Sequence, residues 1–432
     1  MINLDEVISC VNGYDPKALP VALAQQVMRS FVQPTTAIET VPLRAALGRV
    51  LASDAVSPFN VPNYDNSAMD GYAFNSSTLI DTLSTGLIIS GKSLAGVARE
   101  QACESSECIR VMTGAVIPAG CDTVVPQEFC EVENGIVRFD RKAVNVGDNR
   151  RLAGEDLRTG SVAITAGTLL RPAHIGLLAS IGMGEVTVLR KLRVAFFSTG
   201  NELYPIGEPL FDALPPGGVY DSNRYTLCAM LERLGVEPID LGVVRDDPVL
   251  LEAAFTRAVN EADAVVTSGG VSVGEADYTK QVMAKLGRVE FWTIAMRPGR
   301  PMAFGEITCN GKRSVLFGLP GNPVAVMVTF YHFVREALQR MQGMAAAPAP
   351  VYARARASKA IRKKPGRTEY QRGTVTPATA AAGRYEVQLA GAQGSGILSS
   401  MCEANCFIVL HHGQGDVAAG DEVDVLLFEG LI

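Results

Sequence analysis

The chain has 432 residues, a formal charge of −6, 47% hydrophobic residues and 19% charged residues. This length predicts more than one domain, and the acidic balance argues against nucleic acid as the main partner. No apolar run reaches membrane-span length, the N-terminus lacks signal-peptide features, and the nine scattered cysteines show no C-x-x-C pair. We therefore expect a cytoplasmic protein, with free thiols, that binds neither nucleic acid nor a membrane.

Helices are predicted near the N-terminus over residues 3–12 and 18–32, the second from apolar residues at four-residue spacing. Another helix is expected at His174–Ile181, before the chain enters its next domain. We expect residues 1–57 and 150–190 to form one N-terminal domain of helices and extended segments.

Two stretches show short apolar runs separated by Gly, Pro, Asn and Asp, a pattern typical of β domains. Residues 58–149 are expected to form a β-rich domain inserted into the N-terminal one. Residues 350–432 follow a Pro- and Ala-rich linker and predict a small β domain with no clear helix.

Residues 191–342 alternate strands and helices, which predicts βαβ units and a mostly parallel sheet. The expected fold class is therefore α/β plus β in several domains. Strands are expected at Val194–Ser198, Val236–Val243, Ala264–Thr267, Val289–Ala295, Pro301–Phe304 and Ser314–Phe317, and helices at Arg224–Leu234, Pro248–Asn260, Ala276–Leu286 and Pro323–Met341.

A glycine-rich turn follows the strand Ala264–Thr267 and carries Gly269, Gly270, Ser272 and Gly274. Such a turn before a helix exposes backbone N–H groups that can bind a phosphate. Its spacing differs from the dinucleotide fingerprint. The alternative is a βα turn without a ligand, which this stretch alone does not exclude.

Acidic side chains follow three of the predicted strands: Glu202, Asp246 and Asp277. Because parallel strands end at one rim of a sheet, we expect these acids to meet there beside Arg297 and Arg300. Carboxylates without His or Cys favour Mg²⁺, and arginines suit anionic oxygens. The sequence therefore predicts a metal–phosphate site, with Lys280 one turn into the next helix; the alternative is that each acid caps a helix or is solvated.

The turn Leu319-Pro320-Gly321-Asn322-Pro323 comes before the last helix of this domain. It can serve as a stiff helix entry or as a ligand loop with free amide donors. Asp70 in the segment NSAMDGYAF is, by itself, an ordinary Asp-Gly turn.

The motifs together resemble the molybdopterin molybdenumtransferases, the MoeA family, which is similar to the E domain of gephyrin. The resemblance covers nearly the whole chain. It is carried by NSAMDGYA (66–73), RVMTGA (110–115), GED (154–156), FSTGNEL (197–203), YDSNR (220–224), RDDP (245–248), SGGVSVGEADYTK (268–280), RPGRP (297–301), GLPGNPV (318–324), GRTEYQR (366–372) and GSGILSS (394–400).

The resemblance implies an inserted β domain, an α/β domain that carries the pterin site, and a C-terminal β-barrel. It implies an elongated homodimer with active sites between protomers. It also implies a reaction in which adenylylated molybdopterin and molybdate are the substrates, AMP is released with Mg²⁺, and molybdenum stays on the dithiolene. Other enzymes of molybdenum cofactor biosynthesis and acceptor molybdoenzymes are the partners that this role implies.

Carried over by motif, Glu202, Asp246 and Asp277 become acids of the active site. Asp70, Thr113 and Asp156 are expected to come from the partner chain. The pterin phosphate pocket is expected at Gly269, Gly270, Ser272, Pro320 and Pro323, and Arg367 or Arg372 with Ser395 is expected to approach molybdate.

The chain departs from the family pattern where members often carry Lys, at Thr293 and Arg297. Arg297 keeps the positive charge, whereas Thr293 removes one. Either Arg300 supplies the missing cation or oxyanion binding is weaker.

Three other functions fit parts of the sequence. A molybdopterin adenylyltransferase would use a similar α/β domain, although such proteins can consist of that domain alone. A gephyrin-like scaffold would not need the acids and glycines. A nucleic-acid binder would use the basic residues between Arg354 and Arg372, but a basic edge strand is the commoner explanation of such residues, and the whole chain is acidic.

Overall fold

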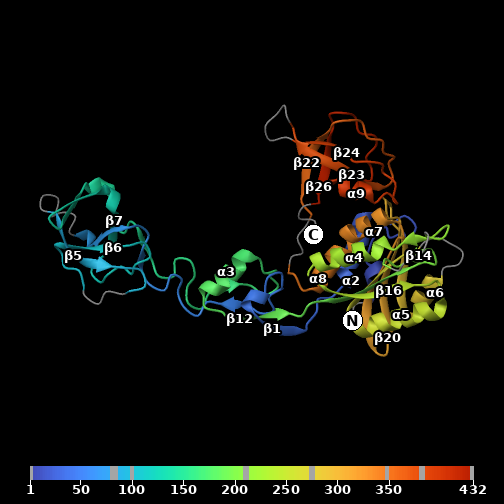
Figure 1. Ribbon diagram of the computed structural model, residues 1–432, viewed down its shortest axis with the longest axis horizontal. Coiled ribbons are helices and arrows are strands. Elements are labelled where there is room, and N and C mark those ends of the chain that lie inside the picture. Colours follow the sequence, from blue (N-terminus) through green and yellow to red (C-terminus); the bar gives the residue numbers. More distant parts are fainter. Residues whose placement is uncertain are drawn as a thin grey trace.

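The computed structural model describes residues 3–77, 86–97, 102–207, 214–271, 278–345, 350–378 and 385–428. The molecule is elongated, with a small β unit at one end and an α/β unit with a C-terminal barrel at the other (Figure 1). A unit that contains α3 (Pro172–Ser180) joins the two ends. The expected fold class, α/β plus β in several domains, is confirmed. No helix among these residues is long and apolar enough to cross a membrane.

The α/β unit is built on a six-stranded sheet in the order β16-β13-β17-β21-β20-β18. Its strands are β13 (Arg193–Thr199), β16 (Glu237–Val244), β17 (Ala264–Ser268), β18 (Gly287–Thr293), β20 (Pro301–Cys309) and β21 (Lys312–Leu319). The first four strands in this order are parallel, and β20 is antiparallel to both of its neighbours. Five strands, β18 included, therefore end at one rim, and this rim positions the site.

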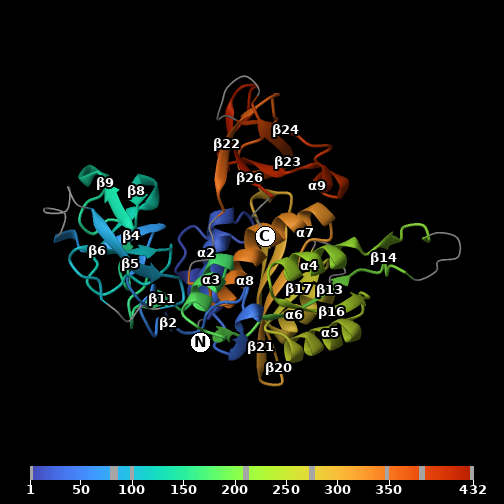
Figure 2. The ribbon, with the colours of Figure 1, turned by 60° about the vertical axis from the view of Figure 1, so that its left-hand side comes forward.

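Alternation along the strands gives the sheet two apolar faces, each covered by helices. In β13, Val194 and Phe196 belong to one core cluster, whereas Ala195 and Phe197 belong to the other. The helices that follow the strands, seen beside the sheet in Figure 2, are α4 (Ser222–Arg233), α5 (Pro248–Glu261) and α6 (Tyr278–Leu286). Asp247 begins α5 as an N-cap that accepts from two backbone N–H groups, at 2.9 and 3.0 Å.

The helix expected at Pro323–Met341 forms, but its middle turn is π-helical. It consists of α7 (Pro323–Thr329), the π segment η5 (Phe330–Val334) and α8 (Arg335–Met341). The His332 carbonyl in this segment accepts a hydrogen bond from Gln25 Nε2 at 2.9 Å. The π turn therefore contacts the N-terminal helix that contains Gln25.

The N-terminal helices α1 (Leu4–Ser9) and α2 (Val21–Phe31) pack on the α/β unit. Phe31 contacts Phe304 of β20 edge-on, with ring centroids 5.4 Å apart. We expected residues 1–57 to group with residues 150–190, but the apolar face of α2 fills one face of the sheet instead. Residues 4–32 thus share the core of the α/β unit.

The remaining part of the expected N-terminal domain forms the joining unit. The core of the joining unit combines apolar residues that precede the inserted sheet in the sequence, such as Leu51, with residues that follow it, such as Ile164 and Val188. Its elements are β1 (Ile38–Pro42), β2 (Ala55–Val56), β11 (Val162–Ile164), α3 and β12 (Glu185–Leu189), with a 3₁₀ turn at Leu43–Ala45.

The inserted unit holds a six-stranded sheet in the order β7-β4-β6-β5-β9-β8. Its strands are β4 (Gly71–Phe74), β5 (Leu87–Ser93), β6 (Glu107–Val111), β7 (Thr123–Pro126), β8 (Cys130–Glu133) and β9 (Ile136–Phe139). The short pair β3 (Asn66–Ser67) and β10 (Arg150–Arg151) lies where the chain enters and leaves it.

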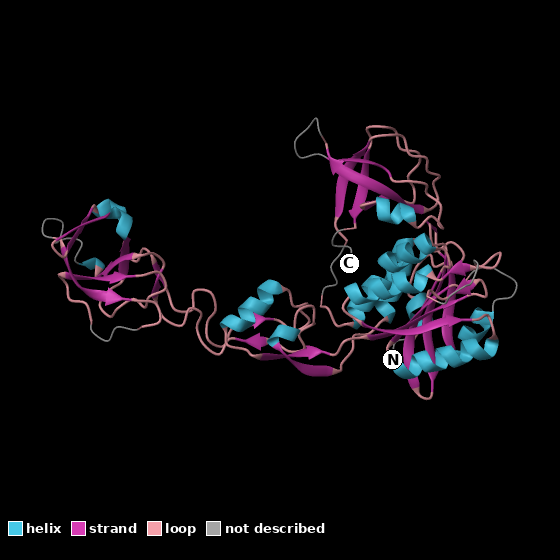
Figure 3. Cartoon of the chain, viewed as in Figure 1, coloured by secondary structure: helices cyan, strands magenta, loops and turns pink. Residues whose placement is uncertain are grey.

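The C-terminal unit is a closed barrel, because β23 pairs with both β24 and β25. Its strands are β22 (Tyr352–Ala357), β23 (Thr368–Pro377), β24 (Tyr385–Leu389), β25 (Cys406–Leu410) and β26 (Glu422–Leu427). The predicted barrel is confirmed, although one short helix, α9 (Ser399–Glu403), interrupts it. Figure 3 shows the barrel as strands above the helices of the α/β unit. The two-residue strand β19 (Met296–Arg297) joins the units, because it leaves the α/β sheet and pairs with β23.

Candidate functional site

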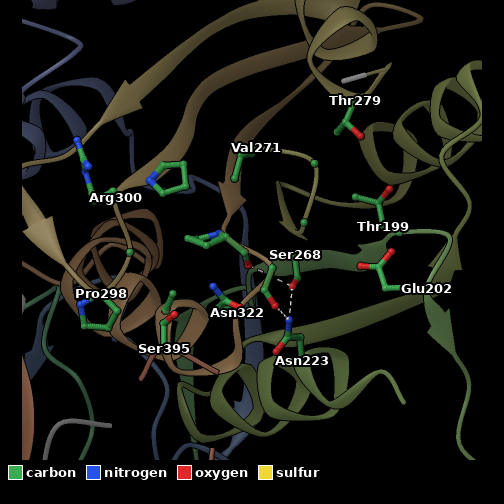
Figure 4. A pocket seen from close by; sticks show the side chains of 18 of the residues that line it. Thr199, Glu202, Asn223, Ser268, Val271, Thr279, Pro298, Arg300, Asn322 and Ser395 are labelled. Carbon is green, nitrogen blue, oxygen red and sulfur yellow. Dashed lines mark hydrogen bonds between the residues drawn. The ribbon is translucent and has the colours of Figure 1, made fainter. Parts of the chain in front are cut away.

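A cavity of about 750 Å³ opens at the rim where the parallel strands end. Its wall is formed by turns from the α/β unit and by residues 367 and 393–395 of the barrel unit. The side chains in Figure 4 come from both units, with Ser395 beside Asn322 at the entry to α7. This position is the one at which parallel α/β sheets bind ligands.

Two predicted acids, Glu202 and Asp246, lie in the wall of this cavity. The Thr199 hydroxyl at the end of β13 donates to Asp246 Oδ1 at 2.7 Å, which orients that carboxylate. Gly200 lies against the Glu202 side chain, because a Cβ atom there would be 2.6 Å from both carboxylate oxygens of Glu202. The absence of a side chain at Gly200 therefore leaves room for the Glu202 carboxylate close to the end of β13.

The glycine turn after β17 forms the adjacent wall. Gly269 has a φ of +94°, and a Cβ atom there would be 2.4 Å from the Thr199 carbonyl oxygen. Gly270 has a φ of +66° and packs on Thr279 of α6. Only glycine tolerates this backbone path, and the path brings peptide groups to the cavity, where they can approach an anion.

Asn223, near the start of α4, ties this turn to the next one. Its Nδ2 donates to Ser268 Oγ at 2.8 Å and to the Gly321 carbonyl at 2.7 Å. Because a carbonyl only accepts, the orientation of the amide is fixed. Pro320, Gly321 and Asn322 thereby face the cavity together with Gly269.

Three arginines supply positive charge on another side of the cavity: Arg297, Arg300 and Arg367. Figure 4 shows Arg300 on one side and Glu202 with Thr199 on the opposite side. Arg367 also pairs with Glu369, Nη2 to Oε1 at 2.8 Å. The cavity therefore separates an acidic wall from a basic wall, an arrangement that suits a metal-bound phosphate and a second oxyanion.

Arg372, the alternative to Arg367 for molybdate, is buried in the barrel and is not in the described cavity wall. It donates to Ser400 Oγ and to the carbonyls of Ala392 and Gly394, each at 3.0 Å. Burial, and then the charge of Arg297, lowers the pKa of Arg372. Arg372 thus supports the loop that carries Ser395 and does not face the ligand space.

Asp70 and Thr113 lie together, but in the inserted unit. Thr113 donates to Asp70 Oδ1 through both its backbone N–H and its hydroxyl, each at 2.7 Å. These hydrogen bonds hold the pKa of Asp70 below its ordinary value. The third residue of this group, Asp156, is exposed and lies where the chain returns from the inserted sheet. Within one chain these three residues are not in the described wall of the cavity.

Five other predicted residues are outside the described wall. Pro323 is the first residue of α7, directly after Asn322, and the Lys280 ammonium lies 5.8 Å from the ring centroid of Phe291. Lys280 therefore packs on β18 and does not join the described wall. Ser272, Gly274 and Asp277 lie outside the described residues.

Sequence reasoning missed Thr199 and Asn223 as site residues, although both lie in motifs that carry the resemblance. Thr199 follows a predicted strand, so its place at the rim could have been inferred from strand order. Asn223 lies inside a helix, and only the structure shows that it reaches two turns from other parts of the chain. Gln393 and Gly394 were missed, although Gly394 begins the motif that supplied the neighbouring Ser395.

The described part of the cavity fits Mg²⁺ in ligand chemistry. Glu202 and Asp246 offer carboxylate oxygens, and no sulfur or imidazole group lines the described wall. Among the described residues no group of three or more acidic, His or Cys side chains is close enough to hold a metal. Two protein carboxylates with phosphate oxygens from a ligand are an ordinary way to bind this ion.

The α/β unit, with its glycine turn and opposed acids and arginines, defines the class of protein: a multidomain α/β protein with accessory β domains and a polar cavity at the rim of its sheet. Three family models match the chain: "MoeA N-terminal region (domain I and II)" over residues 19–182, "Probable molybdopterin binding domain" over 195–340, and "MoeA C-terminal region (domain IV)" over 354–428.

Relatives match along most of the chain. A molybdopterin molybdenumtransferase of Haemophilus influenzae is 42% identical, covering 92% of this chain and 95% of its own. One of Nostoc sp. is 36% identical, covering 90% and 88%. The crystal structure of the molybdopterin biosynthesis moeA protein from Pyrococcus horikoshii OT3 superposes with a TM-score of 0.80 at 29% identity, covering 95% and 100%. The chain belongs to the MoeA family of molybdopterin molybdenumtransferases.

Proposed function

We propose that the protein inserts molybdate into adenylylated molybdopterin and releases AMP in a Mg²⁺-dependent reaction. The observation that carries this proposal is a single cavity in which Glu202 and Asp246 face a glycine turn and an arginine wall. The relatives named as molybdopterin molybdenumtransferases support the choice of substrate.

The residues divide the work by charge. The turns at Gly269–Gly270 and Pro320–Asn322 offer backbone groups to the phosphates. Arg297 and Arg300, with Arg367 and Ser395 from the barrel unit, bind molybdate by charge-assisted hydrogen bonds. The Thr293 position lacks the usual cation, and Arg300 in the cavity wall takes over its role.

Glu202 and Asp246, together with Asp277, would hold Mg²⁺ beside the anhydride that joins AMP to molybdopterin. Bound there, the ion supplies Lewis-acid polarisation of the phosphate oxygens. The Thr199 hydroxyl donates a hydrogen bond to Oδ1 of Asp246, so Oδ2 would remain available to coordinate the metal ion.

We also propose a cytoplasmic homodimer in which the Asp70–Thr113 pair and Asp156 of one chain complete the cavity of the other. In one chain Asp70 and Thr113 belong to the inserted unit, which lies at the opposite end of the molecule from the α/β unit (Figure 1). Asp156 follows in the segment that leads back from the inserted sheet. Partner enzymes are those that supply adenylylated molybdopterin and those that accept the finished cofactor.

The test is AMP release from adenylylated molybdopterin with molybdate and Mg²⁺. Asp246→Asn and Asp277→Asn should each lower the rate by about a hundredfold or more, because a ligand charge is lost. Asp247→Asn is the matched control, because Asp247 is the adjacent acid and Asn caps a helix equally well.

Undiminished release in Asp246→Asn and Asp277→Asn would remove both acids from the mechanism. Formation of adenylylated molybdopterin from ATP and molybdopterin by the wild-type chain would favour the adenylyltransferase function instead. Folding of each variant is checked by its thermal midpoint.

A further inference from the structure

Residues 3–19, which we call the N-terminal strap, cover the free edge of the α/β sheet. β18 is the last strand of the sheet and pairs with β20 on one side only. Apart from its last residue, the strap lies before the part of the chain matched by the N-terminal family model. None of the strap residues lines the described wall of the cavity.

The strap adds a short parallel segment to the open edge of β18. Thr293 N–H donates to the Pro16 carbonyl at 2.6 Å, and Leu19 N–H donates to the Thr293 carbonyl at 3.1 Å. Ala295 N–H then donates to the Leu19 carbonyl at 2.8 Å. These bonds continue past the end of β18, to the residue just before Met296.

Side-chain hydrogen bonds also attach the strap to β18. Trp292 Nε1 donates to the Tyr14 hydroxyl at 2.8 Å, and this hydroxyl donates to Glu290 Oε2 at 3.1 Å. Trp292 is buried, so the indole N–H depends on Tyr14 for an acceptor. Leu19 packs in the same apolar cluster as Met296.

The segment held in this way leads directly into the basic wall of the cavity. Ile294 N–H donates to the Arg300 carbonyl at 2.7 Å and closes the turn that carries Arg297 and Arg300. The barrel holds the same turn from another side, because Thr368 N–H donates to the Ala295 carbonyl at 2.9 Å. The turn is thus fixed between the strap and β23.

We propose that the N-terminal strap, through Tyr14 and Leu19, positions the arginine turn 296–300 for oxyanion binding. This inference rests on the proposed function, in which Arg297 and Arg300 bind molybdate. The strap residues touch no ligand themselves, so they are positioning residues. Loosening the strap should weaken molybdate binding more than AMP binding, because the glycine turn at 269–270 belongs to a different wall of the cavity.

The primary variant is Tyr14→Phe, which keeps the ring and removes the hydroxyl. Trp292 is the single tryptophan of the chain, so its emission reports this contact specifically. We expect a shifted emission maximum, molybdate binding weakened about threefold to tenfold by calorimetry, and AMP affinity within about twofold of wild type. Cys10→Ser, an exposed position on the same strap, is the control and should change none of these.

A second measurement uses the wild-type chain and does not depend on any variant. Coupling is reciprocal, so molybdate should slow hydrogen exchange in the strap, at the amide of Leu19 above all. Molybdate affinity equal to wild type in Tyr14→Phe, or exchange in the strap that molybdate leaves unchanged, would overturn the inference while leaving the proposed function intact. A wild-type chain that binds AMP but no molybdate would overturn the proposed function and the inference together.

Discussion

Gly269→Ala is the substitution that should damage the site most through the backbone alone. Gly269 has a φ of +94°, a conformation that costs an L-residue about 1–2 kcal/mol. The new Cβ would also lie 2.4 Å from the Thr199 carbonyl oxygen, so the end of β13 must move. With about 1–2 kcal/mol for that displacement, we expect a loss of about 2–4 kcal/mol in the free energy of unfolding.

The assay is thermal unfolding followed by the fluorescence of Trp292, which reports on the α/β unit. For a unit of this size the loss corresponds to a midpoint lower by about 4–16 °C. AMP binding should weaken as well, because Thr199 carries the hydroxyl that orients Asp246.

Gly321→Ala is the matched control, because Gly321 lines the same cavity and the nearest atom to its new Cβ is 3.9 Å away. We expect its midpoint to stay within about 1 °C of wild type. A Gly269→Ala chain that melts with the wild type and binds AMP equally would refute the reasoning about the turn.

Thr199→Val removes the donor to Asp246, and steady-state assays should show AMP release slowed about tenfold with an unchanged melting midpoint. Arg372→Met should destabilise the barrel in chemical denaturation by about 1–3 kcal/mol for each of the two carbonyls that lose their donor. Arg367→Gln should mainly weaken molybdate binding in calorimetry; the reverse pattern would exchange their roles. Burial lowers the pKa of His332 to about 3, below its unfolded value, so stability from this neutral imidazole is present above pH 6.5 and lost as pH falls. Denaturation at pH 8 and pH 5 should show about 2 kcal/mol of this loss in wild type and none of it in His332→Phe; equal losses in the two chains would contradict it.

The α/β sheet could be predicted from the sequence because its strands are buried on both faces. Runs such as Ala264–Ser268 are then short, continuously buried and apolar in their first three residues, and helices with clear caps separate them. Strand direction predicted that the polar turns would meet at one rim of the sheet. Glu202, Asp246, Arg297 and Arg300 do line one cavity there.

The placement of the N-terminal helices could not be predicted in the same way. The apolar stripe of α2 shows that it packs against something, but the stripe does not identify the partner. The choice between Arg367 and Arg372 has a similar origin. Arg367 directly precedes β23, and Arg372 lies five positions later, within the strand. Because side chains alternate along extended backbone, residues an odd number of positions apart point to opposite faces of the strand. Sequence alone does not say which side faces the cavity.

The π turn at Phe330–Val334 also has no sequence signal of its own. The helical sequence pattern continues without a break from Pro323 to Met341. The feature that sets the π turn apart is a tertiary contact, the hydrogen bond from Gln25 to the His332 carbonyl. Asn223 is a comparable case, because its two acceptors come from turns 45 and 98 residues away.

The most direct test of the central claim is a crystal soaked with AMP, Mg²⁺ and molybdate, measured at the molybdenum absorption edge. The account predicts one anomalous peak within hydrogen-bonding reach of Arg297, Arg300 or Arg367, with the AMP phosphate against Gly269 and Gly270. A molybdenum peak outside this cavity, or AMP bound away from the glycine turn, would contradict it.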